Sequence, residues 1–246
     1  MFNYLIKIEY DGTKFVGWQS QKNGKSIQDT IEIALKKILK KNTKIIGAGR
    51  TDKGVHAASQ FANFESKKKI DNKKNFLNSI NFFLKKDLIS ILDIKKKTEN
   101  FHARFNANLR TYEYFIINRQ GTLSIYKNKA WHVKKKIDIK LMKKGAKIFE
   151  GTHDFSTFRA ASCSAKSPIK KIYPIKINKK NDMIKIKIIS KSFLQNQVRS
   201  MVGSLIHLST GKWSIIEFKK AFRSKKRIKC APPAPACGLY LLNIKY

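Results

Sequence analysis

The chain has 246 residues, of which 42% are hydrophobic, so it is long enough for one large domain or two small ones with a buried core. Its 53 Lys and Arg residues outnumber 16 Asp and Glu residues, and the resulting formal charge of +37 favours a polyanionic partner such as a nucleic acid. Lysine is over-used throughout the chain, however, so a genome-wide compositional bias explains the charge equally well.

Membrane proteins and disulfide frameworks are disfavoured. Lysines interrupt every hydrophobic run before it reaches the roughly 18 apolar residues of a membrane span, and the start lacks the pattern of a signal peptide. We therefore expect a cytoplasmic protein with no membrane partner. Cys163, Cys230 and Cys237 are odd in number and lack metal-ligand spacing, so reduced thiols are expected.

The first half of the chain predicts the order β-α-β-β-α-β. Apolar side chains alternate from Tyr4 to Tyr10, which indicates a strand. Ser26 followed by Asp29 is a capping pattern that opens a helix. The expected elements are a strand at 4–10, a helix at 27–40, short strands at 44–46 and 60–64, a helix at 73–85 and a strand at 88–94. This order is the split βαβ plan of ferredoxin-like domains.

The second half predicts another α+β unit. Gly211 is a stop signal for one helix, and Ser214 with Glu217 is a capping box that opens the next. The expected strands lie at 111–118, 130–133, 169–177, 183–189 and 239–244, and the expected helices lie at 137–149, at 195–208 and after 214. We therefore expect two α+β halves, residues 1–104 and 105–246, with mainly antiparallel sheets.

A loop at residues 47–57 combines three glycines with both charge signs. Its sequence is Gly-Ala-Gly-Arg-Thr-Asp-Lys-Gly-Val-His-Ala. Glycine permits close approach of another molecule to the backbone, so a shaped functional loop with Asp52 as a nucleophile is one interpretation. A surface turn with an ordinary ion pair between Arg50 and Asp52 is the other.

Other chemistries find little support in the sequence. The chain contains no Walker loop, no dinucleotide glycine fingerprint, no Gly-x-Ser-x-Gly elbow and no closely spaced carboxylates suited to two metals. No metal and no cofactor are therefore expected. A single carboxylate can still act as a covalent nucleophile, and a nearby cation helps to keep it ionised.

Residues 49–57 resemble the Gly-Arg-Thr-Asp-x-Gly-Val-His-Ala signature of the tRNA pseudouridine synthase A family. Seven further blocks resemble family blocks in the family's order, so the resemblance spans nearly the whole chain. These blocks are residues 10–19, 101–105, 110–112, 154–159, 198–199, 202–205 and 238–241.

The resemblance implies a fold and a reaction. The fold would be the pseudouridine synthase fold, with two ferredoxin-like halves whose sheets form a central sheet and cleft around the Asp52 loop. The reaction would convert uridines 38, 39 and 40 of the tRNA anticodon stem-loop to pseudouridine. Asp52 would be the nucleophile, attacking either C1′ of the ribose or C6 of the base. Tyr112 would stack on the uracil and help to move the C5 proton, and Arg199 would pair with the catalytic aspartate.

Further roles follow from the same resemblance. Arg50 would fill the gap left by a flipped uridine, and Arg104 would contact tRNA. His56 is favoured as a structural residue over a site residue. Relatives act as homodimers with tRNA across both subunits, so a homodimer is expected.

Departures from the family pattern occur at residues 84–87, at residues 195–197 and at Ser200, and they concern packing. The Pro- and Ala-rich run at residues 231–237 has no predicted function. The alternatives to the enzyme are a non-catalytic RNA-binding or tRNA-folding protein on the same scaffold, and a phosphodiesterase.

Overall fold

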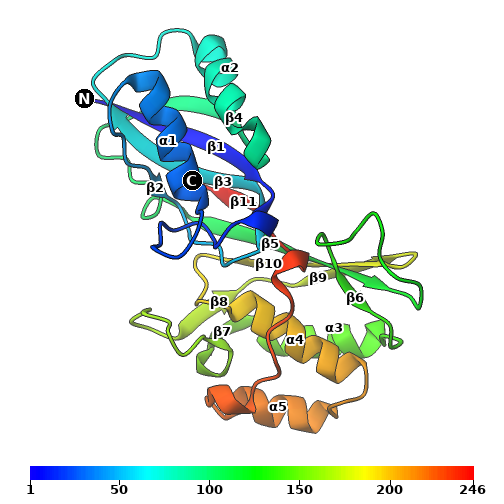
Figure 1. Cartoon of the computed structure of the whole chain (residues 1–246). Helices are drawn as coiled ribbons and strands as arrows, with labels where there is room; N and C mark the ends of the chain where they lie inside the picture. Colours follow the sequence, from blue (N-terminus) through cyan, green and yellow to red (C-terminus); the bar gives the residue numbers. More distant parts are fainter. The chain divides into compact units, whose positions relative to one another are not determined.

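The computed structural model describes all residues from 1 to 246, which form two compact units (Figure 1). The first unit comprises Met1–Asn108 and Tyr240–Tyr246, and the second comprises Leu109–Leu239. Each unit combines helices with a mainly antiparallel sheet, which confirms the predicted α+β class. None of the helices has the length and apolar character needed to cross a membrane.

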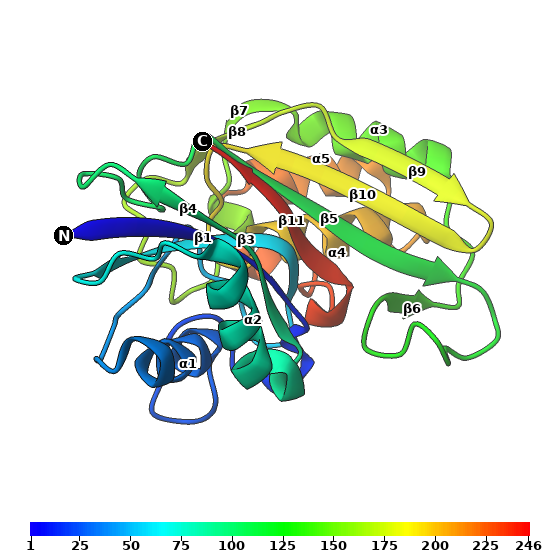
Figure 2. The ribbon, with the colours of Figure 1, turned by 90° about the horizontal axis from the view of Figure 1, so that it is seen from above.

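Two helices of the first unit cover one face of its sheet (Figures 1 and 2). Helix α1 (Ile27–Leu39) begins after Ser26, whose hydroxyl oxygen accepts a hydrogen bond from the backbone N–H of Asp29. Helix α2 (Lys73–Leu84) begins in the same way after Asn72. These side chains satisfy backbone donors that the first turn of a helix leaves unpaired, as the capping pattern at Ser26 predicted.

Strand β1 (Phe2–Tyr10) lies at the centre of the first sheet. It pairs antiparallel with β3 (His56–Ser66) on one side and with β4 (Ile89–Lys97) on the other. The short strand β2 (Ile46–Gly47) pairs antiparallel with β3, and β11 (Leu239–Lys245) pairs with β3 in parallel. The order β1-α1-β2-β3-α2-β4 confirms the predicted ferredoxin-like plan.

The sheet of the second unit is built on one long antiparallel pair, β5 (Leu109–Asn118) with β10 (Met183–Ser190). The hairpin partner β9 (Lys176–Lys180) extends β10, and β6 (Trp131–Val133) pairs in parallel with β5. Lysines on β9 and β10 point to the solvent side of the hairpin, as the alternation predicted. The remaining strands are β7 (Gly151–Asp154) and β8 (Ile169–Ile172).

The predicted strand at 169–177 is wrong as one continuous element. The chain leaves the sheet between Ile172 and Lys176, where Pro174 has no N–H to donate to a neighbouring strand. The N–H of Ile175 is instead satisfied by the Glu150 carboxylate at 2.9 Å. Strand β7, which pairs antiparallel with β8, was not predicted because its four residues show no alternation.

Helices α3 (Ile139–Phe149), α4 (Gln197–Ser209) and α5 (Ile215–Arg223) pack together in the second unit (Figure 1). The capping box of Ser214 and Glu217 is present at the start of α5. Short 3-10 helices occur at Gly12–Lys14, Lys85–Asp87, Ser156–Phe158, Arg227–Lys229 and Ala236–Gly238.

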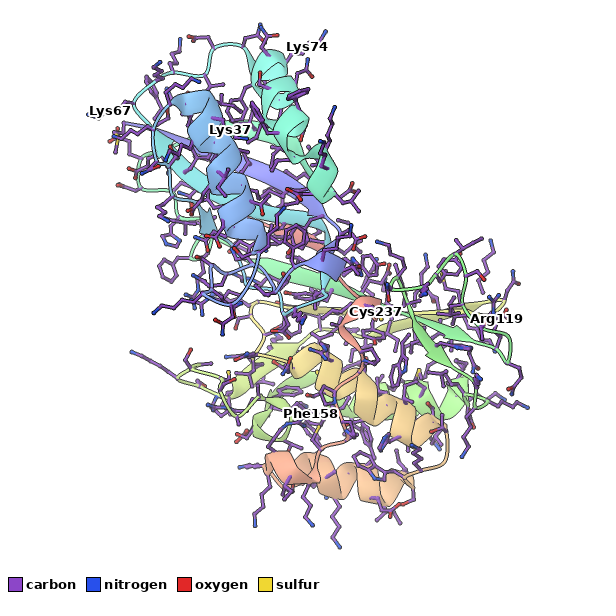
Figure 3. The ribbon with its side chains drawn as sticks, in the orientation of Figure 1. Lys37, Lys67, Lys74, Arg119, Phe158 and Cys237 are labelled. Carbon is purple, nitrogen blue, oxygen red and sulfur yellow. The ribbon has the colours of Figure 1, made fainter.

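Phe149 lies at the centre of an aromatic cluster in the second unit. Its ring centroid is 5.0 Å from that of Phe158, which lies inside the unit in Figure 3, and 6.3 Å from that of Phe155. Phe218 and Phe222 from α5 complete the cluster, with centroids 5.2 Å and 5.5 Å from Phe149. Such tilted and edge-on pairs are favourable, so the family block at 154–159 has a core-forming role here.

Candidate active site

Asp52 lies on a loop that the segment at residues 10–19 holds in place within the first unit. Gly17 and Asp52 form an isolated antiparallel bridge. The N–H of Trp18 donates to the Thr51 carbonyl at 3.0 Å. Backbone pairing of this kind fixes the position of the loop without using its side chains.

A turn follows directly after Asp52. The N–H of Val55 donates to the Asp52 carbonyl at 3.1 Å, and Gly54 between them has φ +79°. Because L side chains rarely adopt that conformation, glycine suits this position. The Asp52 side chain is half-buried, while Arg50 and Lys53 on either side are exposed.

Two glycines beside the loop are required by close backbone contacts. A Cβ at Gly12 would stand 2.0 Å from the Val55 carbonyl oxygen. Gly17 has φ +125°, and a Cβ there would stand 2.8 Å from the Thr51 carbonyl oxygen. Any side chain at either position would therefore push the Asp52 loop out of place.

Two side chains support the same loop. The Tyr10 hydroxyl and the Thr51 hydroxyl lie 2.8 Å apart in a buried hydrogen bond. The Gln60 side-chain amide donates to the Gly49 carbonyl at 2.9 Å. The two blocks at 10–19 and 49–57, which the sequence showed only as motifs, thus form one physical assembly.

His56 is 1% exposed and occupies a structural position. Its Nδ1 accepts a hydrogen bond from the Gly12 N–H at 3.2 Å and lies 3.0 Å from a carboxylate oxygen of Asp11. One nitrogen cannot accept from Gly12 and donate to Asp11 at once, so a ring with a bare Nδ1 uses the first contact and a ring with a proton on Nδ1 uses the second. The ring also stacks on Tyr240 at 4.7 Å.

Arg104 lies in the first unit on the exposed segment that follows β4. Its guanidinium lies 5.7 Å from the centroid of the Phe105 ring, which is 73% exposed. The neighbouring Ala103 is buried, and its carbonyl accepts a hydrogen bond from the Tyr246 hydroxyl at 3.0 Å. The backbone of this segment is therefore anchored, while the cation and the aromatic ring face the solvent.

Tyr112 lies in the second unit, on β5 opposite Ile188 of β10. The side chain is 9% exposed, and its ring meets Phe193 edge-on with centroids 5.3 Å apart. The strand and the neighbouring ring set the direction of the tyrosine.

Arg199 lies on the first turn of α4 in the second unit, where Ala234 and Asn196 contact it. Its Nε donates to the Ala234 carbonyl at 2.7 Å, and one terminal nitrogen donates to the Asn196 amide oxygen at 3.2 Å. The Ala234 N–H donates back to the Arg199 carbonyl at 2.9 Å. The run at residues 231–237 thus lies beside α4, a place that the sequence did not indicate.

Arg50 and Asp52 lie on one loop of the first unit. The structure places Arg104 elsewhere in that unit, and Tyr112 and Arg199 in the second. The sequence did not indicate which residues hold the candidate site residues in place, chiefly Tyr10, Gln60, Asn196 and Ala234. For Ala234 one signal was present, because it has the only backbone N–H in residues 232–235. The chain gathers no cluster of three or more His, Cys, Asp or Glu side chains that could hold a metal ion.

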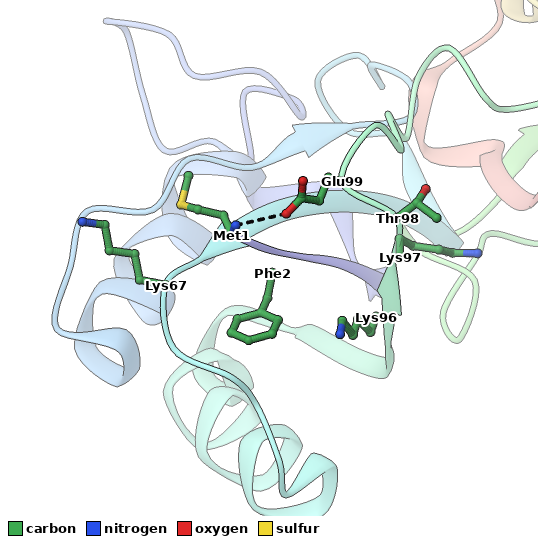
Figure 4. Close-up of a pocket in the computed structure, with 7 residues that line it drawn as sticks. All are labelled: Met1, Phe2, Lys67, Lys96, Lys97, Thr98 and Glu99. Carbon is green, nitrogen blue, oxygen red and sulfur yellow. Dashed lines mark hydrogen bonds and ion pairs between the residues drawn. The ribbon is translucent and has the colours of Figure 1, made fainter.

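A depression of about 540 Å³ lies in the first unit and contains none of the predicted site residues. It is lined by Met1, Phe2, Lys67 and residues 96–99, and the terminal amino group of Met1 pairs with Glu99 at 3.2 Å (Figure 4). Its one carboxylate, Glu99, is exposed and pairs with the terminal amino group. The Asp52 loop is therefore the better candidate.

Comparison with known proteins identifies the family. The tRNA pseudouridine synthase family matches residues 6–106 and 146–246. A solved structure titled as a Cbf5-Nop10-Gar1 complex is 12% identical, covers 83% of this chain and 54% of that chain, and has a TM-score of 0.36.

Curated relatives match along all or nearly all of their lengths. The tRNA pseudouridine synthase A of Pelagibacter ubique is 54% identical over 100% of both chains. Those of Maricaulis maris and Beijerinckia indica are 41% and 42% identical over 100% of this chain and 98% and 94% of theirs. The resemblance drawn from the sequence motifs is confirmed, and the chain belongs to the tRNA pseudouridine synthase family, a family of isomerases.

Proposed function

We propose that this protein converts uridine to pseudouridine at positions 38, 39 and 40 of the tRNA anticodon stem-loop. The observation that carries the proposal is the full-length similarity to proteins named tRNA pseudouridine synthase A. It agrees with the position of Asp52 on a loop whose backbone is paired with Gly17. The reaction breaks the N-glycosidic bond and rejoins the same uracil through C5, so nothing is added or lost. No metal or cofactor is required for that exchange.

Asp52 is the proposed nucleophile. A carboxylate can attack C1′ of the ribose or C6 of the base, and it is a good enough leaving group to be expelled after the base has turned. Arg199 supplies the cation that orients Asp52 and keeps it ionised. In this proposal residues 1–104 carry the nucleophile, and residues 105–246 complete the site with Tyr112 and Arg199.

Tyr112 is proposed to stack on the uracil and to help move the C5 proton. Arg50, which is exposed beside Asp52, fills the space that the flipped uridine leaves in the stem. Arg104 contacts the tRNA backbone, supported by its exposure and by the neighbouring Phe105. The protein acts in the cytoplasm as a homodimer, with the tRNA contacting both subunits.

The direct test incubates the purified protein with an unmodified tRNA transcript in a metal chelator and maps pseudouridine. We expect product at uridines 38–40 and none in a transcript with cytidine at those positions. Binding without product would favour the RNA-binding alternative, and cleaved RNA would favour the phosphodiesterase.

The dimer is tested separately by sedimentation of the protein with and without tRNA. A mass of about twice 28.4 kDa for the free protein supports the proposal. A monomer that modifies tRNA at full rate would contradict it.

A further inference from the structure

Residues 231–238 follow a path of close contacts over α4 and β5 of the second unit. A Cβ at Gly203 of α4 would stand 2.1 Å from the Pro232 carbonyl oxygen, and a Cβ at Gly238 would stand 2.6 Å from the Tyr114 ring. Cys237, labelled in Figure 3, directs its thiol to the Ala130 carbonyl at 3.6 Å. The segment thus contacts α4 at Pro232 and β5 at Gly238.

The prolines of this segment leave one backbone donor in residues 232–235. Pro232, Pro233 and Pro235 have no N–H, so Ala234 alone can donate there. That N–H reaches the Arg199 carbonyl at 2.9 Å, and the Ala234 carbonyl accepts the Arg199 Nε–H at 2.7 Å. Ala234 is therefore joined to both the backbone and the guanidinium of Arg199.

Tyr114 fixes the peptide next to Ala234. Its side chain is fully buried on β5, and its hydroxyl donates to the Pro235 carbonyl at 2.6 Å. Burial raises the pKa of the Tyr114 hydroxyl well above its ordinary value, so the group stays protonated and remains a donor.

Asn196 holds the other side of the guanidinium. It lies three residues before Arg199 and has φ +62°, which directs the chain into α4. Its amide oxygen accepts from a terminal nitrogen of Arg199 at 3.2 Å. Contacts at Nε and at one terminal nitrogen together define the plane of a rigid guanidinium.

We propose that Tyr114 and Asn196 are positioning residues that set the guanidinium of Arg199 for its action on the Asp52 carboxylate. Tyr114 acts through Pro235 and Ala234, and Asn196 acts directly on the side chain. The inference rests on the proposed function and adds two residues and one segment to it. A purely structural role for the Tyr114 hydroxyl would instead stabilise the fold and leave the chemistry unchanged.

The test compares Tyr114→Phe with Tyr4→Phe. The Tyr4 hydroxyl is also buried in a backbone contact, accepting from the Ile70 N–H at 2.8 Å in the first unit. We expect Tyr114→Phe to lower kcat about tenfold with the KM for tRNA unchanged, which is the size of one hydrogen bond to a charged network. Tyr4→Phe should keep the kcat of the unchanged protein.

The pH profile separates positioning from stability. A displaced Arg199 holds Asp52 ionised less well, so the acid limb of the kcat profile should move to higher pH in Tyr114→Phe. It should not move in Tyr4→Phe. Asn196→Gly should show the same shift, because glycine accepts the positive φ while removing the amide. This variant also keeps the test valid if Tyr114→Phe does not fold.

A double-mutant cycle with Arg199→Lys completes the test, because lysine lacks the Nε contact. In that background Tyr114→Phe should change kcat by less than about twofold, since the interaction is already lost. Independent, multiplicative losses would overturn the proposal. The proposal would also be overturned if the protein without substitutions forms pseudouridine and both Tyr114→Phe and Asn196→Gly have the same kcat and pH profile as that protein. If the unchanged protein forms none, the proposed function itself fails.

Discussion

The two units hold their proposed site residues by different physical means. In the first unit the Asp52 loop is placed by backbone contacts, with Gly12 and Gly17 leaving no room for a side chain. In the second unit Arg199 is placed by hydrogen bonds from its own side chain, to Ala234 and Asn196. Close backbone contact also occurs in the second unit, at Gly203, but there the side chain of Arg199 additionally depends on its own hydrogen bonds.

This difference predicts two kinds of sensitivity to mutation. A loop held by close backbone contacts is displaced when a methyl group is added at the contact, because a close-packed interior has no space for the extra atom. A side chain held by hydrogen bonds loses its orientation in steps, as each contact is removed. Glycine substitutions should therefore be severe in the first unit, and hydroxyl deletions should be graded in the second.

The largest effect is expected for Gly12→Ala. The added methyl group would stand 2.0 Å from the Val55 carbonyl oxygen, so the backbone that carries Asp52 must move. We expect about 3 kcal/mol of lost stability and almost no turnover. Denaturant unfolding and the pseudouridine assay measure the two effects.

Gly121→Ala is the matched control, since a Cβ there meets nothing within 4 Å. It should leave stability and turnover unchanged. If Gly12→Ala behaves like this control, the loop is not held by backbone shape.

An intermediate effect is expected for Tyr10→Phe. The variant removes one buried hydroxyl contact, to Thr51, and leaves the backbone contacts of the loop in place. Stability should fall by about 1–2 kcal/mol, but kcat should change less than in Tyr114→Phe. An equal or larger loss of kcat in Tyr10→Phe would erase the contrast between the two units.

The smallest effect concerns stability at high pH. The pKa of Tyr114 is raised by burial, so its contribution is complete below the unfolded tyrosine pKa of about 10 and is lost as pH rises above it. Tyr114→Phe has no such group. The stability difference between the two proteins should therefore narrow in thermal melts as the pH rises above about 10, and a constant difference would contradict the burial of a neutral hydroxyl.

Local patterns predicted most of the elements. The alternation from Tyr4 to Tyr10 and the caps at Ser26 and Ser214 depend on residues close in sequence, and each gives the element expected. The alternation of lysine and isoleucine predicted one continuous strand at 169–177, but the strand is interrupted at Pro174. The pairing of β11 with β3 joins residues about 180 positions apart, and no local pattern reports such a contact.

In the candidate site, too, local features could be predicted from the sequence and long-range contacts could not. Asp52 could be proposed from its loop and its motif, because glycines and charges are visible in the sequence. The contacts of Tyr10 with Thr51 and of Ala234 with Arg199 could not, since they depend on tertiary packing between segments 35 or more residues apart. The roles proposed for Arg50, Arg104, Tyr112 and Arg199 stay predictions.

The most direct test of the account is Asp52→Asn, which keeps the size of the side chain and removes its charge. Incubated with an unmodified tRNA transcript, the variant should form no pseudouridine. Its tRNA affinity at fixed salt should stay close to that of the unchanged protein, because phosphate contacts by Lys and Arg supply most of the binding. Normal turnover by Asp52→Asn would show that Asp52 is not the nucleophile.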